Sequence, residues 1–311
     1  MHVISASRRT DIPAFHADWF MRRIRDRRVQ VLAPFGGGVF EVSLDPSDVI
    51  AIVFWTKDAA PILSQLEELV QLGHCFTFLY SINNYPHFLE PNVPPLTHTM
   101  KVLEKLAKLL PPYSLRWRYD TIVMTDQLDE RWHLNNFRNL CLELAPYTRE
   151  CIFSFCDYYK KTIRNMKRLV PEFQEPEESR CVEIAVQLAN IAESRGIKLK
   201  SCAHDFLVSD KIGKSRCIDP GVLLNVVDSQ ERRSAVERLK FVATRKDCGC
   251  AASKDIGAYD SCAHGCVYCY ANANADLARR NLMKIDRDQL CLDPKICGRR
   301  SRIDTDAHSN E

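Results

Sequence analysis

The chain has 311 residues, of which 46% are hydrophobic, and its formal net charge at pH 7 is +3. This length suffices for a barrel-sized core with a small appendage, and so slight a charge does not indicate a nucleic-acid partner. The first residues lack the apolar run of a secretory signal, and no segment approaches the roughly 18 apolar residues of a spanning helix. We therefore expect a cytoplasmic protein without a membrane partner.

Short apolar runs alternate with helical patterns along the first two-thirds of the chain. Runs rich in β-branched and aromatic residues predict strands at 3–7, 49–55, 75–81, 114–119, 151–156 and 197–202. Periodic patterns between them predict helices at 60–72, 100–110, 134–145 and 178–195. Such alternation is typical of βαβ units and a parallel sheet. It fits an open doubly wound sheet or a complete or partial (β/α) barrel, and no G-x-G-x-x-G follows a strand to favour a dinucleotide-binding sheet.

Polar and charged side chains follow the predicted strands, and this pattern favours the barrel. Any strand must end in something polar, but runs such as R-R-x-D and W-R-Y-D are unusual for ordinary loops. The carboxyl ends of parallel strands meet on one face, where sites are built. We predict catalytic or substrate-binding roles there for Arg118, Asp120, Lys57 and Tyr159. These charges suit a small anionic or zwitterionic substrate, or a phosphate.

The composition changes near residue 246, where the chain becomes rich in Cys, Ala, Gly and Asn. We predict a barrel-like domain over 1–245 and a cysteine-rich iron–sulfur segment over 246–311 that packs on it. Such a segment buries little by itself, so a bound inorganic centre or the barrel must order it. Most of the fourteen cysteines follow Lys200. In a reducing compartment this distribution indicates metal binding rather than disulfides.

Cys262, Cys266 and Cys269 form a C-x3-C-x2-C pattern, called the triad below. Structural zinc needs four ligands, and Cys266 with Cys269 could pair with Cys248 and Cys250, which would leave Cys262 over. A [4Fe–4S] cluster held by three thiolates instead uses the whole triad and leaves one iron open to an outside ligand. We favour the cluster.

A second group of cysteines comprises Cys202, Cys217, Cys248 and Cys250. Four thiolates could hold an auxiliary [4Fe–4S] cluster or a tetrahedral zinc ion. Cys248 and Cys250 are separated only by Gly249, which permits a tight turn. The cysteines at 75, 141, 151, 156 and 181 fall in strand or helix patterns, where we expect small buried hydrophobic groups.

The stretch CAHGCVYCYA at 262–271 resembles the cluster-binding loop of the radical S-adenosylmethionine superfamily, and its sequence is similar to that loop in the spore photoproduct lyase-like branch. Over nearly its full length the chain also resembles a bacterial family of unknown function, number 1848. Members share S-A-S-R-R-T-D-I-P, F-W-T-K, W-R-Y-D and the cysteine cluster, which occur here at 5–13, 54–57, 117–120 and 248–269. That family supplies no reaction.

The superfamily resemblance implies a set of roles. The triad would hold the cluster, and the open iron would be chelated by the amino and carboxylate groups of S-adenosylmethionine. Electron transfer from the reduced cluster would then break a carbon–sulfur bond, with an electron donor such as flavodoxin or ferredoxin. Tyr268, before the last cysteine, would lie near the adenine.

The position of the loop departs from the superfamily, in which it follows the first strand. We therefore predict a permuted core, with a strand at 256–259 and a helix at 271–281 that complete the sheet beside the strand at 3–7. The loop after that strand would then meet the methionine group of the cofactor. Thr10 or Asp11 would accept from its ammonium, and Arg8 or Arg9 would bind its carboxylate in a fork geometry. Structural ion pairs are the alternative for the two arginines.

Three classes of function remain open at this point. The leading one is a radical S-adenosylmethionine enzyme acting on a small molecule. The second is an iron–sulfur or zinc-binding nucleic-acid repair or binding protein without radical chemistry, although we do not expect nucleic acid, because the basic run at 22–28 is more typical of a solvated helix face. The third is a structural zinc protein.

Overall fold

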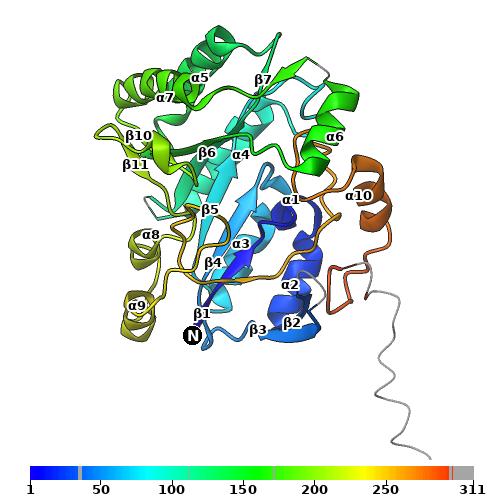
Figure 1. Ribbon diagram of the computed structural model, residues 1–311. Helices are drawn as coiled ribbons and strands as arrows, with labels where there is room; N and C mark the ends of the chain where they lie inside the picture. Colours follow the sequence, from blue (N-terminus) through cyan, green and yellow to red (C-terminus); the bar gives the residue numbers. More distant parts are fainter. Residues whose placement is uncertain (34–36, 112, 171, 294–295, 297–311) are drawn as a thin grey trace, which may run out of the picture.

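The computed structural model describes residues 1–33, 37–111, 113–170, 172–293 and 296, and a parallel sheet runs through its centre (Figure 1). Among these residues, eight strands lie in the order β11-β10-β8-β6-β5-β4-β1-β12, and every neighbouring pair is parallel. Their bounds are β1 His2–Ala6, β4 Val49–Thr56, β5 Phe76–Ser81, β6 Leu115–Ile122, β8 Glu150–Phe155, β10 Lys198–Ser201, β11 Ile212–Lys214 and β12 Lys254–Asp255. The six predicted strands are confirmed.

Helices connect these strands. They are α1 Ile12–Phe15, α2 Ala17–Arg25, η2 Ala60–Gln65, α3 Leu66–Gln71, α4 Leu96–Leu109, α5 Glu130–Leu144, α6 Lys160–Leu169, α7 Glu178–Glu193, η3 Asp205–Leu207, α8 Pro220–Leu224, α9 Gln230–Glu237 and α10 Ala275–Leu282, where η marks a 3-10 helix. Two small antiparallel pairs stand apart from the main sheet, β2 Arg28–Leu32 with β3 Val39–Ser43 and β7 Met124–Thr125 with β9 Phe173–Gln174. The four predicted helices are confirmed, the first as η2 followed by α3.

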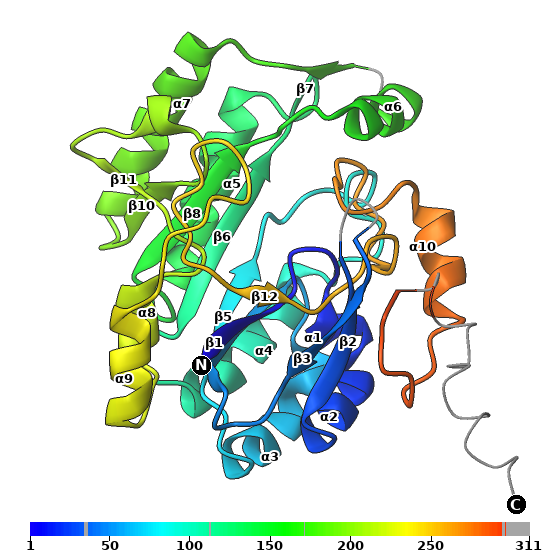
Figure 2. The same ribbon diagram turned by 60° about the horizontal axis from the view of Figure 1, so that its bottom comes forward.

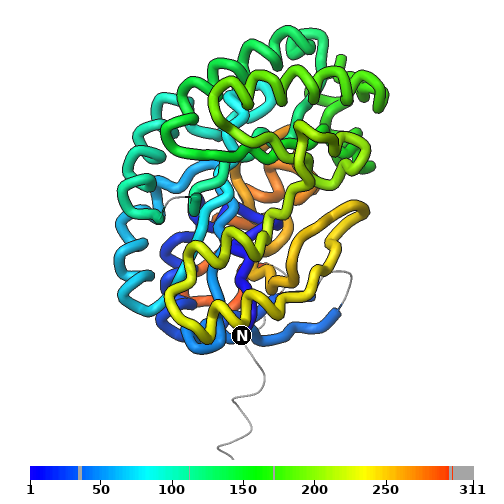
Figure 3. The backbone as a smooth tube through the Cα atoms, turned by 90° about the vertical axis from the view of Figure 1, so that its left-hand side faces the viewer, coloured from blue at the N-terminus to red at the C-terminus, as the bar shows by residue number. Residues whose placement is uncertain are grey.

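Both faces of the sheet are covered. Every residue of β4 is buried, as expected for a central strand of a parallel sheet. Ile52 and Phe54 belong to the core shared with the helices, which follow one another in an arc in Figure 3. Val53 and Trp55 point to the other face, where the chain from 215 to 252, with α8 and α9, supplies a second core.

The last strand of the chain lies beside the first (Figure 2). In β12, Lys254 pairs with Ile4 and Asp255 with Ser5, and the Ile256 N–H donates to the Ser5 carbonyl at 3.1 Å. The strand predicted at 256–259 therefore belongs two residues earlier. The reason is a turn after Asp255, whose carboxylate accepts from the Gly257 N–H at 3.1 Å. A side chain at Gly257 would collide with Ser7, so glycine allows this close approach.

The predicted α/β fold with a large parallel sheet is confirmed, but a closed barrel is not found. Among the described residues no pairing joins β11 to β12, and these edge strands have only 3 and 2 residues to offer hydrogen bonds. Residues 297–311 of the predicted cysteine-rich segment lie outside the described residues. Within the described part of the chain, no helix has the length and apolarity needed to cross a membrane.

Candidate metal centre

The triad lies on the loop between β12 and α10, beyond the carboxyl end of β12. Four backbone N–H groups donate to two of its sulfur atoms, those of Asp11 and His264 to Cys262 and those of Ala271 and Asn272 to Cys269. Such hydrogen bonds stabilise the thiolate form and tune iron–sulfur centres. Burial nevertheless raises the pKa of all three thiols above the ordinary value, so a bound cation is needed to deprotonate them.

His264, inside the triad loop, fixes that loop to the rest of the protein. Its Nε2 lies 2.8 Å from Asp11 Oδ2, and its Nδ1 lies 3.2 Å from the Asn92 carbonyl oxygen. The Asp11 carboxylate also accepts from the Thr56 hydroxyl at 2.8 Å and from the Lys57 N–H at 2.7 Å. Both Asp11 oxygens are thus engaged by protein donors, and Asp11 joins β1, β4 and the triad loop.

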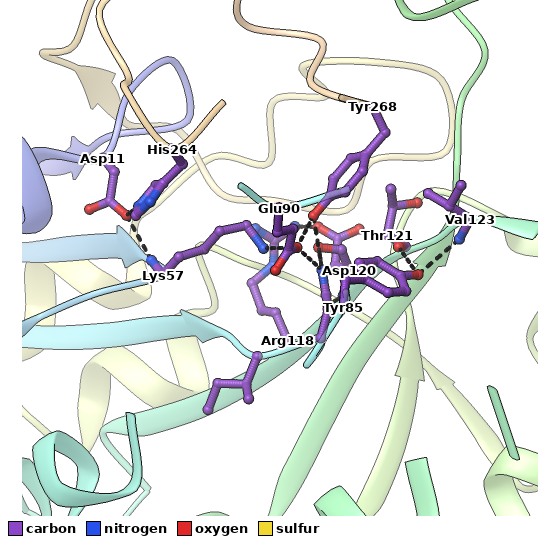
Figure 4. A network of polar contacts seen from close by, with 12 residues as sticks. Asp11, Lys57, Tyr85, Glu90, Arg118, Asp120, Thr121, Val123, His264 and Tyr268 are labelled. Atoms are coloured by element: carbon purple, nitrogen blue, oxygen red, sulfur yellow. Dashed lines mark hydrogen bonds and ion pairs between the residues drawn. The ribbon is translucent and has the colours of Figure 1, made fainter. Parts of the chain in front are cut away.

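A buried polar network holds Tyr268 of the triad loop (Figure 4). Glu90 accepts from Lys57 Nζ at 2.8 Å, from Asn83 Nδ2 at 3.0 Å and from the Tyr268 hydroxyl. Burial opposes ionisation of Glu90, but the Lys57 charge and these hydrogen bonds outweigh it and lower the pKa. The network borders a cavity of about 260 Å³ that Lys57, Asn83 and Glu90 help to line.

A second ion pair lies at the ends of β4 and β6. Arg118 pairs with Asp120, and its guanidinium stands 4.9 Å from the centre of the Trp55 ring. The guanidinium of Arg8 lies 5.2 Å from the same ring. Burial opposes ionisation of Asp120, yet Arg118 and a hydrogen bond from Ser154 lower its pKa. Two cations and a carboxylate therefore share this corner of the sheet.

Asp255 ties β12 to the loop after β1. Its carboxylate accepts from the hydroxyls of Ser5 at 2.8 Å and Ser7 at 2.7 Å, and from the Arg8 N–H at 2.8 Å. It also pairs with Arg9 Nε at 3.0 Å. Burial opposes ionisation of Asp255, but the charge of Arg9 and these donors lower its pKa. Arg9 thus has a protein partner, whereas Arg8 makes no ion pair with any described residue.

The second group of cysteines, called the four-thiol group below, comes together from distant parts of the chain. The Sγ atoms of Cys202 and Cys217 are 3.9 Å apart. Cys217 also hydrogen-bonds with Cys250, and Cys250 with Cys248. Hydrogen bonding from Cys250 lowers the pKa of Cys248 to about 4. As the side chains stand, no three His, Cys, Asp or Glu groups among the described residues form a ready site for one metal ion.

The comparison with family models gives one decisive result. The model "Domain of unknown function (DUF1848)" matches residues 3–271, which is most of the chain. The chain belongs to this family. The DUF1848 match spans β1 to the triad, so it includes the sheet, the buried networks and both cysteine groups.

Other comparisons add little. No curated protein matches the chain. Among solved structures, one is described as the tandem GH20 catalytic modules of the pneumococcal exo-β-D-N-acetylglucosaminidase, with a TM-score of 0.26 and 11% identity. The match covers 75% of this chain and 62% of that one. So low a similarity bears on neither the fold nor the function.

The remaining predicted residues fall in different surroundings. The Thr10 hydroxyl is buried and has no hydrogen-bond partner among the described residues. Tyr159 is 46% exposed at the start of α6, and no described contact joins its ring to Arg118 or Lys57. Sequence reasoning missed Glu90 and Asp255, because each is an ordinary acidic residue until the fold surrounds it with donors. Sequence reasoning also gave no role to His264, although its place between two triad cysteines was a signal that it anchors the loop.

Proposed function

We propose that the protein is a radical S-adenosylmethionine enzyme, with a [4Fe–4S] cluster on the triad and a small polar or anionic substrate. The observation that carries this proposal is the position of the C-x3-C-x2-C loop. It follows β12, a strand that lies beside β1 in a parallel sheet, and backbone N–H groups donate to two of its sulfurs. In parallel α/β folds the carboxyl ends of the strands carry the site.

We also propose that the open sheet is a partial (β/α) barrel related to the superfamily core by permutation. The spatial order β12-β1-β4-β5-β6-β8 supports this proposal, because it begins with the strand before the triad loop although that strand is last in the sequence. The loop after β1, with Thr10 and Arg8, is then the neighbour of the triad loop in space.

The residues present fit the cluster and its ligand. In a cuboidal cluster each thiolate binds a different iron, so the triad need not surround one ion. Two buried oxygen atoms near the triad have no partner among the described residues, Thr10 Oγ1 and Asn272 Oδ1. Asn272 also donates to the Cys262 carbonyl at 2.7 Å. Unpaired buried acceptors of this kind suit the ammonium group of a ligand.

When bound and reduced, such a cluster supplies the electron that breaks a carbon–sulfur bond of S-adenosylmethionine. The residues of this chain would bind S-adenosylmethionine and orient it against the cluster. Thr10 would accept from the methionine ammonium, and Arg8 would bind the carboxylate, since Arg9 and Asp11 are held by other partners. Tyr268 would lie near the adenine. The hydrogen bond from its hydroxyl group to Glu90 would hold the ring in that position.

The substrate would meet the ion pairs at the strand ends. Arg118 and Lys57 would bind an anionic group, while Asp120 would accept from a donor on the same molecule. Burial of these charges strengthens their interactions with a ligand and excludes water. A reducing partner such as flavodoxin or ferredoxin would supply the electron.

Anaerobic reconstitution tests the proposal. The protein is loaded with iron and sulfide without oxygen, and cleavage of S-adenosylmethionine is followed after reduction with dithionite. We expect about four irons on the triad and a cleavage product, both lost in C262A/C266A/C269A and kept in the control C141A, which changes a buried cysteine of α5. Intact S-adenosylmethionine with an iron-loaded, reduced protein would overturn the proposal.

A further inference from the structure

We infer that the four-thiol group binds a single divalent metal ion as a tetrahedral tetrathiolate, with zinc as the expected ion. This inference goes beyond the proposed function. It concerns a separate group of cysteines and requires neither S-adenosylmethionine nor an iron–sulfur cluster on the triad. It also chooses between the two centres that the sequence leaves open for these four cysteines.

The convergence of the thiols is the first argument. Cys202 follows β10, Cys217 follows β11, and Cys248 and Cys250 lie in the segment before β12. Three of the four are buried, with Cys217 only 3% exposed. Contacts run from Cys202 to Cys217, then to Cys250 and Cys248. Hydrophobic packing does not require thiols from three separate segments to meet. A tetrathiolate site does require this.

The spacing of the sulfur atoms favours one ion. Zinc–sulfur bonds of about 2.3 Å in tetrahedral geometry place sulfur atoms about 3.8 Å apart. The observed separation of Cys202 and Cys217 is 3.9 Å. In a cuboidal cluster each thiolate binds its own iron, so the sulfurs lie farther apart. A disulfide would bring them to about 2.05 Å.

Two basic side chains lie next to the sulfurs, where they would balance the negative charge of a metal tetrathiolate. Arg245 Nη2 donates to Cys202 Sγ at 3.5 Å, and Arg118 stands near Cys202 and Cys217. Each arginine also pairs with a carboxylate, Asp157 for Arg245 and Asp120 for Arg118. These ion pairs hold the guanidinium groups in place beside the sulfurs.

Metal binding requires a local rearrangement but no redox step. At present the thiols contact one another in a row, and no three metal-binding side chains among the described residues form a ready site. Four sulfur–metal bonds would form, and the protons of those thiols that are still protonated would pass to solvent. Cys248 is the least buried of the four and follows an irregular stretch, so it can move toward the other sulfurs.

The test is elemental analysis of the full chain after purification without added metal. We expect about one zinc per chain, present also in C262A/C266A/C269A, so that this inference can hold even where the proposed function fails. Zinc should fall to background in C217S/C250S and stay in the control C181S, which changes a buried cysteine of α7. Cobalt added to the metal-free protein should give intense thiolate-to-metal absorption in the wild type and in C181S, but not in C217S/C250S.

A milder variant covers the case in which C217S/C250S does not fold. In C248S, which changes the most accessible of the four thiols, zinc should be lost to a competing chelator at about tenfold lower chelator concentration. Unchanged zinc content and chelator resistance in C248S would overturn the inference. So would iron and sulfide, without zinc, in the triad variant.

Discussion

The two cysteine groups of this protein are built in opposite ways. The triad occupies one loop after β12, and its sulfurs accept hydrogen bonds from backbone N–H groups. The four-thiol group is assembled from three separate segments, and its sulfurs touch one another and the side chain of Arg245. A local spacing thus defines one group, and the sheet topology defines the other.

This difference indicates which kind of metal centre each group of thiols suits. Thiols that are spread along a loop and need not share one ion suit a cuboidal cluster with an open iron. Thiols in mutual contact suit a single closed ion. Since Arg118 interacts electrostatically with both Cys202 and Tyr270, and Tyr270 follows the last cysteine of the triad, the two groups border the same corner of the sheet. The predictions below separate them.

The largest expected effect is that of Asp255→Ala, which removes the link between β12 and the loop after β1. Arg9 would be left as a mostly buried cation without its partner, and four further donors would lose their acceptor. We expect a loss of about 3–5 kcal/mol in the free energy of unfolding, measured by urea denaturation. The control is Asp205→Ala, which breaks an exposed pair with Lys214 and should cost about 0–1 kcal/mol. Equal midpoints for the two variants would contradict this role of Asp255.

Glu90→Gln should affect the triad and spare the four-thiol group. The change removes the charge that balances buried Lys57 and weakens the hydrogen bond from Tyr268. We expect a stability loss of about 2 kcal/mol and slower cleavage of S-adenosylmethionine, with zinc content unchanged. Glu104→Gln, on the exposed side of α4, is the matched control. An unaltered cleavage rate in Glu90→Gln would argue against any role of this network in holding the triad loop.

The acid sensitivity of the fold must be known before metal loss at low pH is assigned to either group. Burial lowers the pKa of His133 to about 4 from an ordinary 6.5, and the Val123 carbonyl offsets this only in part. The unfolded chain therefore takes up a proton below pH 6.5 while the folded chain does not until about pH 4. Stability is complete above pH 6.5 and falls by about 1.4 kcal/mol per pH unit for this histidine as the pH drops toward 4.

His133→Gln should flatten that decline, because glutamine can keep the bonds to Tyr119 and Val123 without titrating. The measurement is the urea midpoint at a series of pH values between 7 and 4. His98→Gln, an exposed position beside Asp58, should leave the slope as it is. If both variants gave the wild-type slope, His133 would not be the source of acid sensitivity.

The smallest effect is that of Arg245→Gln on the four-thiol group. Its guanidinium donates to Cys202 and pairs with Asp157, but it is not a ligand. We expect zinc affinity to fall by about tenfold in chelator competition, while iron loading of the triad stays at the wild-type level. The opposite pattern, with iron lost and zinc kept, would reverse the assignment of this arginine.

The sequence predicted the parallel sheet well, for a physical reason. Strand runs such as 49–55 are buried on both faces, so their apolar character survives in any context. The triad was recognised from its local spacing, and its role as a cluster site stays a prediction. The grouping of Cys202, Cys217, Cys248 and Cys250 was also predicted, and their contacts appear in the structure. The predicted position of the last strand was wrong by two residues, because the turn at Gly257 depends on the close approach of this glycine to Ser7.

Partners that come from distant loops could not be predicted. Glu90 is defined by donors from the residue after β4, from the loop after β5 and from the triad loop. The engagement of Asp11 and Arg9 likewise depends on His264 and Asp255, which are more than 240 residues away in the chain. Because Arg9 is paired with Asp255, we propose that Arg8 binds the methionine carboxylate.

The central claim is that the triad holds a cluster with an open iron that S-adenosylmethionine occupies. Electron paramagnetic resonance of the reduced protein tests it most directly. We predict a signal from a reduced [4Fe–4S] cluster that changes shape when S-adenosylmethionine is added, persists in C217S/C250S and is missing from C262A/C266A/C269A. A signal that ignores S-adenosylmethionine, or one that survives loss of the triad, would contradict the claim.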